Sequence, residues 1–419
     1  MDDLANYLPP LLTGAELIEA LTRLPEYNVD IRLMPASERL MRLTDIYRVF
    51  LPTTMCVDIY HKLYMMTRMS LDQKGNSDSV RRLNATYNLM HGLEYHGVIT
   101  GGTCATVIGS SGIGKTSCVQ YSIELLGGVI DKQESCHKIV PVLQISCPYD
   151  SSCKGLLFQI IIAIDEALGS NYYDTVCKSR VNSQQLLGVV SQICHLHVGT
   201  LVVDEIQNII EHRAGRQLYM MLIQLINTTG ISLLLVGTPE CTAFFQQVPQ
   251  MARRTVGLNY GPMTYGDDFS RLCSTIYSYQ YVYKASAFNE SICNWLFMHS
   301  GGLPSSLVAL VYFAQEVAIL RGIESLGLES LTIAYNERMR MLHRHTLPSI
   351  HSKLPQTTKL KREFLPIPKE ASLHVAVTRT MADVVTAYKR TGGDLIAGLR
   401  SMFSVEEIDD SVHAEDLPR

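Results

Sequence analysis

The sequence lacks the features that mark membrane and exported proteins. None of its hydrophobic runs reaches the roughly 18 consecutive apolar residues that a membrane-spanning helix needs, although 47% of the 419 residues are hydrophobic. The first residues, MDDLANYLPP, lack the basic and then apolar arrangement of a signal peptide. These absences predict a cytoplasmic protein whose apolar residues form at least one buried core.

Cysteine pairs of the C-x-x-C kind and an excess of positive charge are also missing. The eleven cysteines stand singly, which argues against a disulfide framework and a cysteine-rich zinc site. We expect most of them to be buried fillers in a reducing compartment. Because the formal net charge is −4, any binding of nucleic acid must come from a local basic patch.

The spacing of apolar residues and the composition change along the chain, and these changes predict four parts. Residues 1–95 carry apolar side chains at helical spacing, which indicates a helical N-terminal segment. In residues 96–262, short β-like runs alternate with amphipathic stretches, as in an α/β domain with a parallel sheet covered by helices. Residues 263–345 favour a small all-helical domain. Residues 346–419 have prolines, a basic stretch and an acidic end, which favours a flexible arm with one short helix near 378–402.

Short apolar runs within residues 96–262 are the predicted strands. They are TCATVIG, VPVLQIS, TLVVDE and ISLLLVG, with TVGLNY as a further candidate. In an open α/β sheet, ligands bind outside the carboxyl ends of the strands. The polar residues that follow these runs are therefore the candidates for a functional site.

The first run leads into a nucleotide-binding motif. The string GSSGIGKT satisfies the pattern G-x-x-x-x-G-K-[ST] between a strand-like and a helix-like run. Its glycines let the backbone curl and present N–H groups to phosphates, Lys115 would reach the β- and γ-phosphates, and the Thr116 hydroxyl would hold Mg²⁺. The predicted ATP-binding residues are Gly109, Ser110, Ser111, Gly112, Ile113, Gly114, Lys115, Thr116 and Ser117. The alternative is a glycine-rich turn that only closes a strand.

Two further runs end in residues suited to hydrolysis. Asp204 and Glu205 end the third run, so Asp204 can hold Mg²⁺ through its water shell and Glu205 can orient or deprotonate the attacking water. Acids at a strand end are common, so this pair indicates a role in hydrolysis only because a P-loop precedes it in the sequence. Thr238 follows the fourth run and could contact the γ-phosphate or that water. It could equally be a polar residue that closes a buried strand.

Arg253 and Arg254 follow in the string QMARRTVG, between the helix expected after Thr238 and the last candidate strand. An arginine at this place could reach the nucleotide of a neighbouring subunit and stabilise the charge of the transition state. The alternative is an exposed pair near a helix end.

The strings GSSGIGKT, LVVDE, LLLVGTP and ARR, followed by a helical unit, resemble AAA+ ATPases and most closely the TnsC/TniB family of transposition regulators. The stretch from RLMPASERL to YMMTR looks like the N-terminal segment of TnsC-type proteins, and EIQNII with LLLVGTPE looks like the family's core. The resemblance implies an AAA+ P-loop fold with a helical lid, and an ATP-dependent oligomer, ring or helical filament, on duplex DNA of any sequence. Such an oligomer links a target-selector protein to a transposase.

The resemblance also carries residue roles. It supports the ATP, Mg²⁺ and catalytic roles given above, and it places Lys154, after the second core strand, where family members contact the DNA backbone. A solvated loop lysine is the alternative. One departure is the string GGLPSS, at residues 301–306, where AAA+ lids often carry an arginine. Because that arginine is absent, the arginines expected to act between subunits are the better candidates for contacting the γ-phosphate.

Two other functions remain open from the sequence. The string GLPSSL also resembles the lid of STAND-type signalling NTPases, which act as nucleotide-gated interaction switches without DNA. Those proteins usually continue into long repeat arrays, and only about 75 residues follow the lid here. A scaffold with a degenerate site is the third possibility. The intact Lys115, Asp204 and Glu205 argue against it.

Overall fold

The computed structural model describes most of the chain up to residue 343. The described residues are 4–74, 102–132, 137–150, 152–178, 182–208, 215–246 and 257–343. The chain divides into two units, Met1–Pro355 and Gln356–Arg419, and all of the described residues belong to the first. Arg253, Arg254, the predicted arm after residue 345 and its helix near 378–402 lie outside the described residues.

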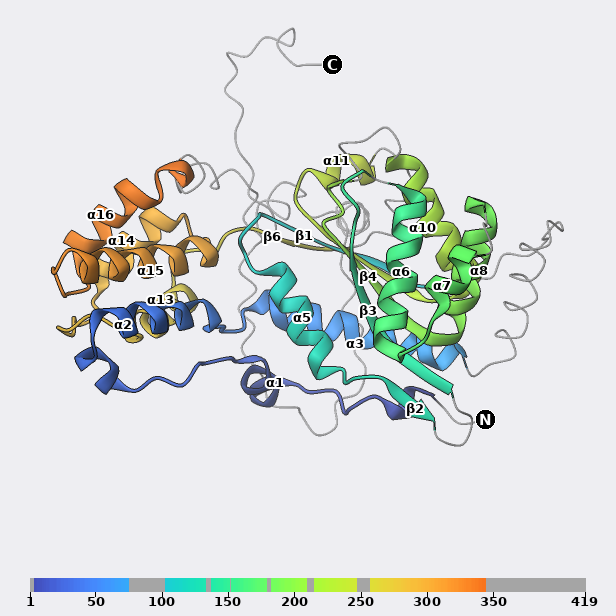
Figure 1. Ribbon diagram of the computed structural model, residues 1–419, viewed down its shortest axis with the longest axis horizontal. Helices are drawn as coiled ribbons and strands as arrows, with labels where there is room; N and C mark the ends of the chain where they lie inside the picture. The colour runs from blue at the N-terminus through green and yellow to red at the C-terminus, as the bar shows by residue number, and fades with distance from the viewer. Residues whose placement is uncertain are drawn as a thin grey trace, which may run out of the picture. The chain divides into compact units, whose positions relative to one another are not determined.

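A six-stranded sheet forms the centre of the α/β core (Figure 1). Its strands are β1 (Cys104–Gly109), β2 (Ile130–Lys132), β3 (His137–Ser146), β4 (Val198–Asp204), β5 (Ser232–Gly237) and β6 (Leu258–Tyr260). Their order is β2-β3-β4-β5-β1-β6, and every pair is parallel except β2 with β3. Each of the five candidate runs therefore contains a strand, with β6 formed by the last three residues of TVGLNY. The edge strand β2 was not predicted, because three residues that include two charges carry no strand pattern.

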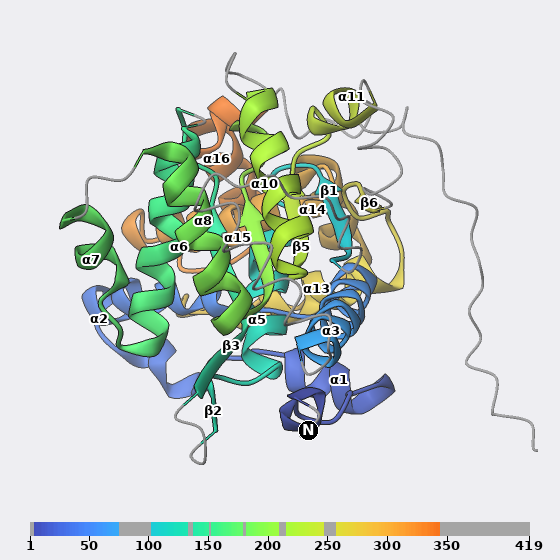
Figure 2. The ribbon, with the colours of Figure 1, turned by 90° about the vertical axis from the view of Figure 1, so that its right-hand side faces the viewer.

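Helices cover both faces of the sheet, as the alternation of strands and helices predicts. One face packs against α6 (Cys153–Leu168), α8 (Ser183–His197) and α10 (Gly215–Thr229), which lie side by side in Figure 2. The other face packs against α3 (Thr54–Lys74) and α5 (Lys115–Leu125). Within β5, Leu233 and Leu235 join the first cluster and Leu234 and Val236 join the second, because successive strand residues point to opposite faces. Two short helices, α7 (Tyr172–Lys178) and α11 (Cys241–Gln246), complete the core.

Residues 4–74 of the N-terminal segment are mostly helical, as predicted, but the chain changes direction before α3. The segment's elements are η1 (Leu4–Tyr7), α1 (Gly14–Leu21), η2 (Val29–Leu33), α2 (Ala36–Arg42) and η3 (Leu43–Arg48). Val49 and Phe50, which belong to the predicted helical pattern, are extended instead, and Phe50 forms an isolated antiparallel bridge with Arg23. Pro52 keeps the helix from starting earlier, because a proline disfavours helical backbone in the residue before it, here Leu51, and has no N–H to donate.

The lid is all-helical, as expected. It contains α13 (Asp267–Ser278), α14 (Glu290–Ser300), α15 (Pro304–Leu320), α16 (Leu328–Arg338) and η4 (Arg340–Leu342). Leu43 and Ile46 of the N-terminal segment are buried in the same hydrophobic cluster as Leu307 and Leu310 of α15. No single described helix is long and apolar enough to cross a membrane; α14 and α15 meet those criteria only as a pair, bent by 117°.

A buried ion pair joins the N-terminal segment to the lid. Arg39 on α2 is 5% exposed. Its two terminal nitrogens each lie 2.7 Å from a carboxylate oxygen of Glu324, in the turn after α15. The guanidinium also donates to the carbonyls of Tyr281 and Met34, at 3.0 and 3.1 Å. Five donors in a planar fork make Arg suited to such a site, so this contact fixes α2 against the lid.

One expectation about the cysteines needs correction. Cys56 on α3 and Cys118 on α5 form a disulfide between the N-terminal segment and the helix that follows the P-loop. Sequence patterns do not indicate this pair, because 62 residues separate the two positions. Cys147, Cys194, Cys241, Cys273 and Cys293 are buried and are not part of a disulfide. Burial raises the pKa of Cys147 and Cys194 to about 12, which suits inert fillers.

Candidate nucleotide-binding site

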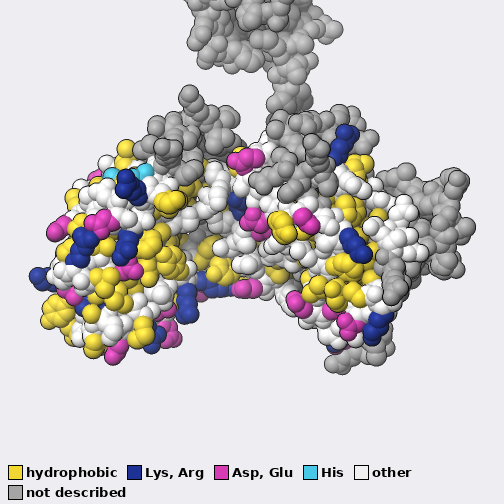
Figure 3. All heavy atoms as spheres, turned by 45° about the horizontal axis from the view of Figure 1, so that its top comes forward, with side chains coloured by type: hydrophobic (Ala, Val, Ile, Leu, Met, Phe, Trp, Pro, Cys, Tyr) yellow, Lys and Arg dark blue, Asp and Glu magenta, His cyan; other side chains and the backbone are white. Residues whose placement is uncertain are grey.

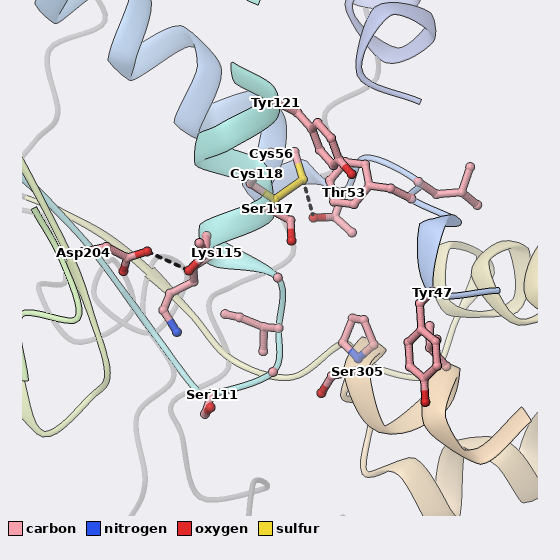
Figure 4. Close-up of a pocket in the computed structure, with 18 of the residues that line it drawn as sticks. Tyr47, Thr53, Cys56, Ser111, Lys115, Ser117, Cys118, Tyr121, Asp204 and Ser305 are labelled. Atoms are coloured by element: carbon pink, nitrogen blue, oxygen red, sulfur yellow. Dashed lines mark hydrogen bonds between the residues drawn. A yellow bond between two sulfur atoms is a disulfide. The ribbon is translucent and has the colours of Figure 1, made fainter. Parts of the chain in front are cut away.

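A pocket of about 450 Å³ lies at the carboxyl ends of β1, β4 and β5 (Figure 4). Three parts of the chain line it. The P-loop and strand ends contribute Ser111 to Cys118, Asp204, Glu205, Gln207, Gly237 and Thr238. The N-terminal segment contributes Tyr47, Val49, Phe50, Leu51, Thr53 and Cys56, α5 adds Tyr121, and the lid contributes Leu272, Pro304, Ser305 and Val308. Ser111 to Ser117, predicted to bind ATP, therefore line the same pocket as Asp204, Glu205 and Thr238, whereas Gly109 and Ser110 are not among its lining residues.

The P-loop backbone needs glycine at two of its positions. Gly112 and Gly114 have φ angles of +81° and +93°, in the region that L side chains rarely adopt. A Cβ atom at Gly112 would also lie only 2.2 Å from the Ser305 hydroxyl oxygen. Around Gly114, apart from the adjoining chain, no described residue comes within 4 Å of such a Cβ atom, so the backbone there is open to a ligand. This open, tightly curled backbone at the start of α5 fits a phosphate group.

Lys115 is held inside the loop by carbonyl groups. Its Nζ donates to the carbonyl oxygens of Gly109 and Ser110, at 2.7 and 3.0 Å, and the residue is 9% exposed. Burial lowers the pKa of its ammonium group, and the charges of Asp204 and Glu205 act in the opposite direction. A phosphate chain in the pocket would supply the negative charge that favours the ammonium form.

Thr116 and Asp204 face each other across the site. The Thr116 hydroxyl donates to Asp204 Oδ2 at 2.7 Å, and the backbone N–H of Glu205 donates to Oδ1 at 2.8 Å. Asp204 is 5% exposed, so this carboxylate is fixed in place. Among the described residues there is no group of three or more His, Cys, Asp or Glu that could hold a metal alone. A hydroxyl beside a single carboxylate instead suits Mg²⁺, which is commonly bound by one or two carboxylates together with substrate phosphates.

Glu205 and Thr238, the predicted catalytic residues, also line the pocket. Glu205 is exposed and has a φ of +58°, which is unusual for a residue with a side chain. Its carboxylate accepts a hydrogen bond from the Gln207 amide. Thr238 is half-buried, and its hydrogen bond to Glu240 is the main reason why the pKa of Glu240 is lowered. Thr238 thus both closes β5 and borders the pocket, so its two interpretations are compatible.

The structure does not bring every predicted residue to this pocket. Lys154 is exposed on the first turn of α6, with its Nζ 5.6 Å from the centre of the Phe158 ring, and it is not among the pocket residues. Ser152 caps that helix by accepting a hydrogen bond from Gly155 N–H. Lys154 thus sits at a helix start that follows the carboxyl end of β3. The arginines predicted to act between subunits fall outside the described ranges.

Sequence reasoning missed the half of the pocket away from the P-loop. Phe50 and Tyr121 pack with ring centres 4.6 Å apart, and both line the pocket. The apolar run IYRVFLP was the available signal, but its helical spacing led to a different interpretation. In the lid, Ser305 lies beside the P-loop and its N–H donates to the Gly112 carbonyl at 3.1 Å. A serine hydroxyl therefore borders the pocket from the lid, within the string in which AAA+ lids often have an arginine.

The chain is similar to one described family and to several solved structures. The family described as "Bacterial TniB protein" matches residues 80–259. No curated protein sequence matches significantly. Among solved structures, the Aeropyrum pernix ORC1 protein in complex with DNA is similar, with 16% identity, a TM-score of 0.41, and coverage of 63% of this chain and 65% of that one. The Aeropyrum pernix ORC2 protein has 15% identity, a TM-score of 0.38, and coverage of 62% and 66%.

A third similar structure is the Thermotoga maritima RuvB Holliday junction branch migration motor, with 12% identity, a TM-score of 0.33, and coverage of 64% and 69%. The chain spans slightly less than two thirds of the length of the ORC1 and ORC2 proteins.

Proposed function

We propose that this chain, whose residues 80–259 match the TniB family, is an AAA+ ATPase that regulates DNA transposition. In this proposal it binds Mg·ATP, assembles head to tail on duplex DNA of any sequence, and connects a target-selector protein with a transposase. The observation that carries the proposal is the convergence of Lys115, Thr116, Asp204, Glu205 and Thr238 on one pocket at the strand ends.

Some of the site residues would bind ATP and Mg²⁺, and the others would activate the attacking water. The P-loop N–H groups and Lys115 would hold the β- and γ-phosphates, while Thr116 and Asp204 would hold Mg²⁺. Bound Mg²⁺ neutralises charge on the phosphates. Glu205, exposed at the pocket wall, would orient or deprotonate the attacking water, and Thr238 would contact that water or the γ-phosphate. We expect Glu205→Gln to retain ATP while stopping turnover.

Assembly would complete the site. No arginine from the lid lines the pocket among the described residues, and Ser305 borders the P-loop instead. Charge that develops in the transition state would then be stabilised by Arg253 or Arg254 of a neighbouring subunit. Contacts of this head-to-tail kind build a ring if the rotation closes and a filament if it does not.

DNA binding would depend on local contacts. On the face drawn in Figure 3, Lys and Arg side chains are interspersed with Asp and Glu over the described surface and do not merge into one basic area. Lys154 is the contact that we propose within this surface, since an exposed ammonium at a helix start can reach a phosphate. Many subunits along one duplex would multiply such a single contact.

Binding of labelled duplex DNA, measured against salt with a non-hydrolysable ATP analogue, tests the proposal. We expect affinity that requires the analogue, ignores sequence and falls steeply with salt, because each phosphate contact releases counterions. Lys154→Ala should weaken binding equally on all sequences. Lys62→Ala, at an exposed lysine on α3 across the sheet, is the matched control and should not. Nucleotide binding without any DNA binding would instead support a protein-only switch of the STAND type.

A further inference from the structure

The turn after β4 holds a glutamine that the sequence analysis left without a role. The Ile206 N–H donates to the Val236 carbonyl of β5 at 3.0 Å, and the Asn208 side chain donates to the Cys147 carbonyl beyond β3 at 3.0 Å. The turn is therefore attached to the chain on both sides of β4. Gln207 lies between these two attachments and lines the nucleotide pocket. Its backbone position is consequently fixed relative to the strand ends.

The side chain of Gln207 is oriented by Glu205. Its Nε2 donates to Glu205 Oε2, while its Oε1 is buried and has no hydrogen-bond partner among the described residues. A buried acceptor without a partner costs roughly 1–3 kcal/mol. Turning the amide over would place Oε1 against the carboxylate, which is less favourable still. The contact with Glu205 thus determines which way the amide points.

Glu205 has little else to hold its side chain. The residue is exposed, and within the described ranges Gln207 is the group that donates to its carboxylate. Asp204, the preceding residue, is in contrast buried and accepts two hydrogen bonds. A general base must lie within hydrogen-bond reach of the water that it activates, so a carboxylate that samples several rotamers spends less time in the productive one.

We propose that Gln207 is a positioning residue that fixes the Glu205 carboxylate for ATP hydrolysis. This inference rests on the proposed role of Glu205 as the residue that activates water. Gln207 acts through Glu205, and it is not needed for ATP binding, since neither Lys115 nor Thr116 bonds to it. Its loss should therefore affect turnover and not affinity.

Steady-state ATPase kinetics of Gln207→Leu test the inference. We expect kcat to fall about tenfold, which is the effect of about 1.4 kcal/mol, in the range of one hydrogen bond to a charged group. KM for ATP should change less than twofold. Gln159→Leu is the matched control, because Gln159 also has a buried, unpartnered amide oxygen but lies on α6 and is not among the pocket residues. Its kcat should equal that of the wild type.

The double variant Glu205→Gln/Gln207→Leu separates this inference from the proposed function. If Gln207 acts through Glu205, the leucine should not lower further the residual ATPase rate that single-turnover assays detect in Glu205→Gln. A wild-type rate for Glu205→Gln alone would overturn the role of Glu205 itself. An inactive Glu205→Gln with an unchanged kcat for Gln207→Leu would overturn only the inference. Melting curves check that each variant folds, and Gln207→Met, closer in shape, replaces the leucine if that variant does not.

Discussion

Replacing Arg39 with methionine would remove the guanidinium that joins α2 to the lid while keeping most of the side-chain volume. The change leaves Glu324 without the two 2.7 Å bonds from Arg39, and it leaves the carbonyls of Met34 and Tyr281 without their donor. Glu324 retains one bond, from the N–H of Tyr283 at 3.0 Å, and 24% of its side chain is exposed. The Glu324 carboxylate would therefore keep one hydrogen bond and part of its contact with water.

These contacts set the size of the expected effect. Removing one partner of a buried ion pair costs about 3–5 kcal/mol, and the partial exposure of Glu324 places this variant near the lower end. A loss of about 3 kcal/mol lowers Tm by roughly 6–12 °C for a cooperative unit of 150–250 residues. Glu324→Leu should lower the stability by at least as much. It leaves the guanidinium of Arg39, whose side chain is only 6% exposed, without its carboxylate partner.

The effect should also depend on pH. The Arg39 hydrogen bond is the main reason why the pKa of Glu324 lies below its ordinary value of 4.5. A lowered folded-state pKa adds stability that is complete above the unfolded-state pKa and is lost as the pH falls through the folded-state value. The difference in Tm between wild type and Arg39→Met should therefore be constant from about pH 6 to 8 and shrink below about pH 4.5.

Thermal unfolding followed by circular dichroism measures both quantities. Arg271→Met is the matched control, because Arg271 pairs with Asp268 in the same lid while their side chains are 59% and 68% exposed. An exposed pair contributes about 0–1 kcal/mol, so this variant should melt within a few degrees of the wild type. If Arg39→Met melted at the same temperature as Arg271→Met, the buried pair would not hold the N-terminal segment to the lid.

Two further predictions concern residues outside the described ranges. Mixing Arg253→Ala/Arg254→Ala subunits with Lys115→Ala subunits should restore part of the ATPase activity that each parent lacks, because a subunit can donate an arginine to a neighbour's intact P-loop; co-assembled but inactive mixtures would argue against arginines acting between subunits. A chain that ends at Leu347 should keep ATPase activity and assembly on DNA but lose transposase in a pull-down; an early-melting truncated protein that fails to assemble would indicate instead that the C-terminal region packs on the lid.

The sequence by itself determined the phosphate-binding half of this protein. The P-loop from Gly109 to Thr116 is contiguous, and its function follows from glycine, lysine and hydroxyl chemistry at fixed spacing. Asp204 and Thr238 lie far along the chain, yet Asp204 ends one strand and Thr238 follows another, and parallel strands end at the same edge of the sheet. Strand signals and strand ends are local, so these residues could be placed together without coordinates.

Only the tertiary structure decided what forms the rest of the pocket. Phe50 and Tyr121 meet across 71 positions of sequence, Ser305 reaches Gly112 across 193, and Arg39 reaches Glu324 across 285. The orientation of the Gln207 amide likewise depends on which atoms surround it. Periodicity and motifs report which residues are buried or chemically suited, but they contain no information on which distant segments face each other. That is set by the packing of the N-terminal segment and the lid around the sheet, where burial of apolar surface selects one arrangement.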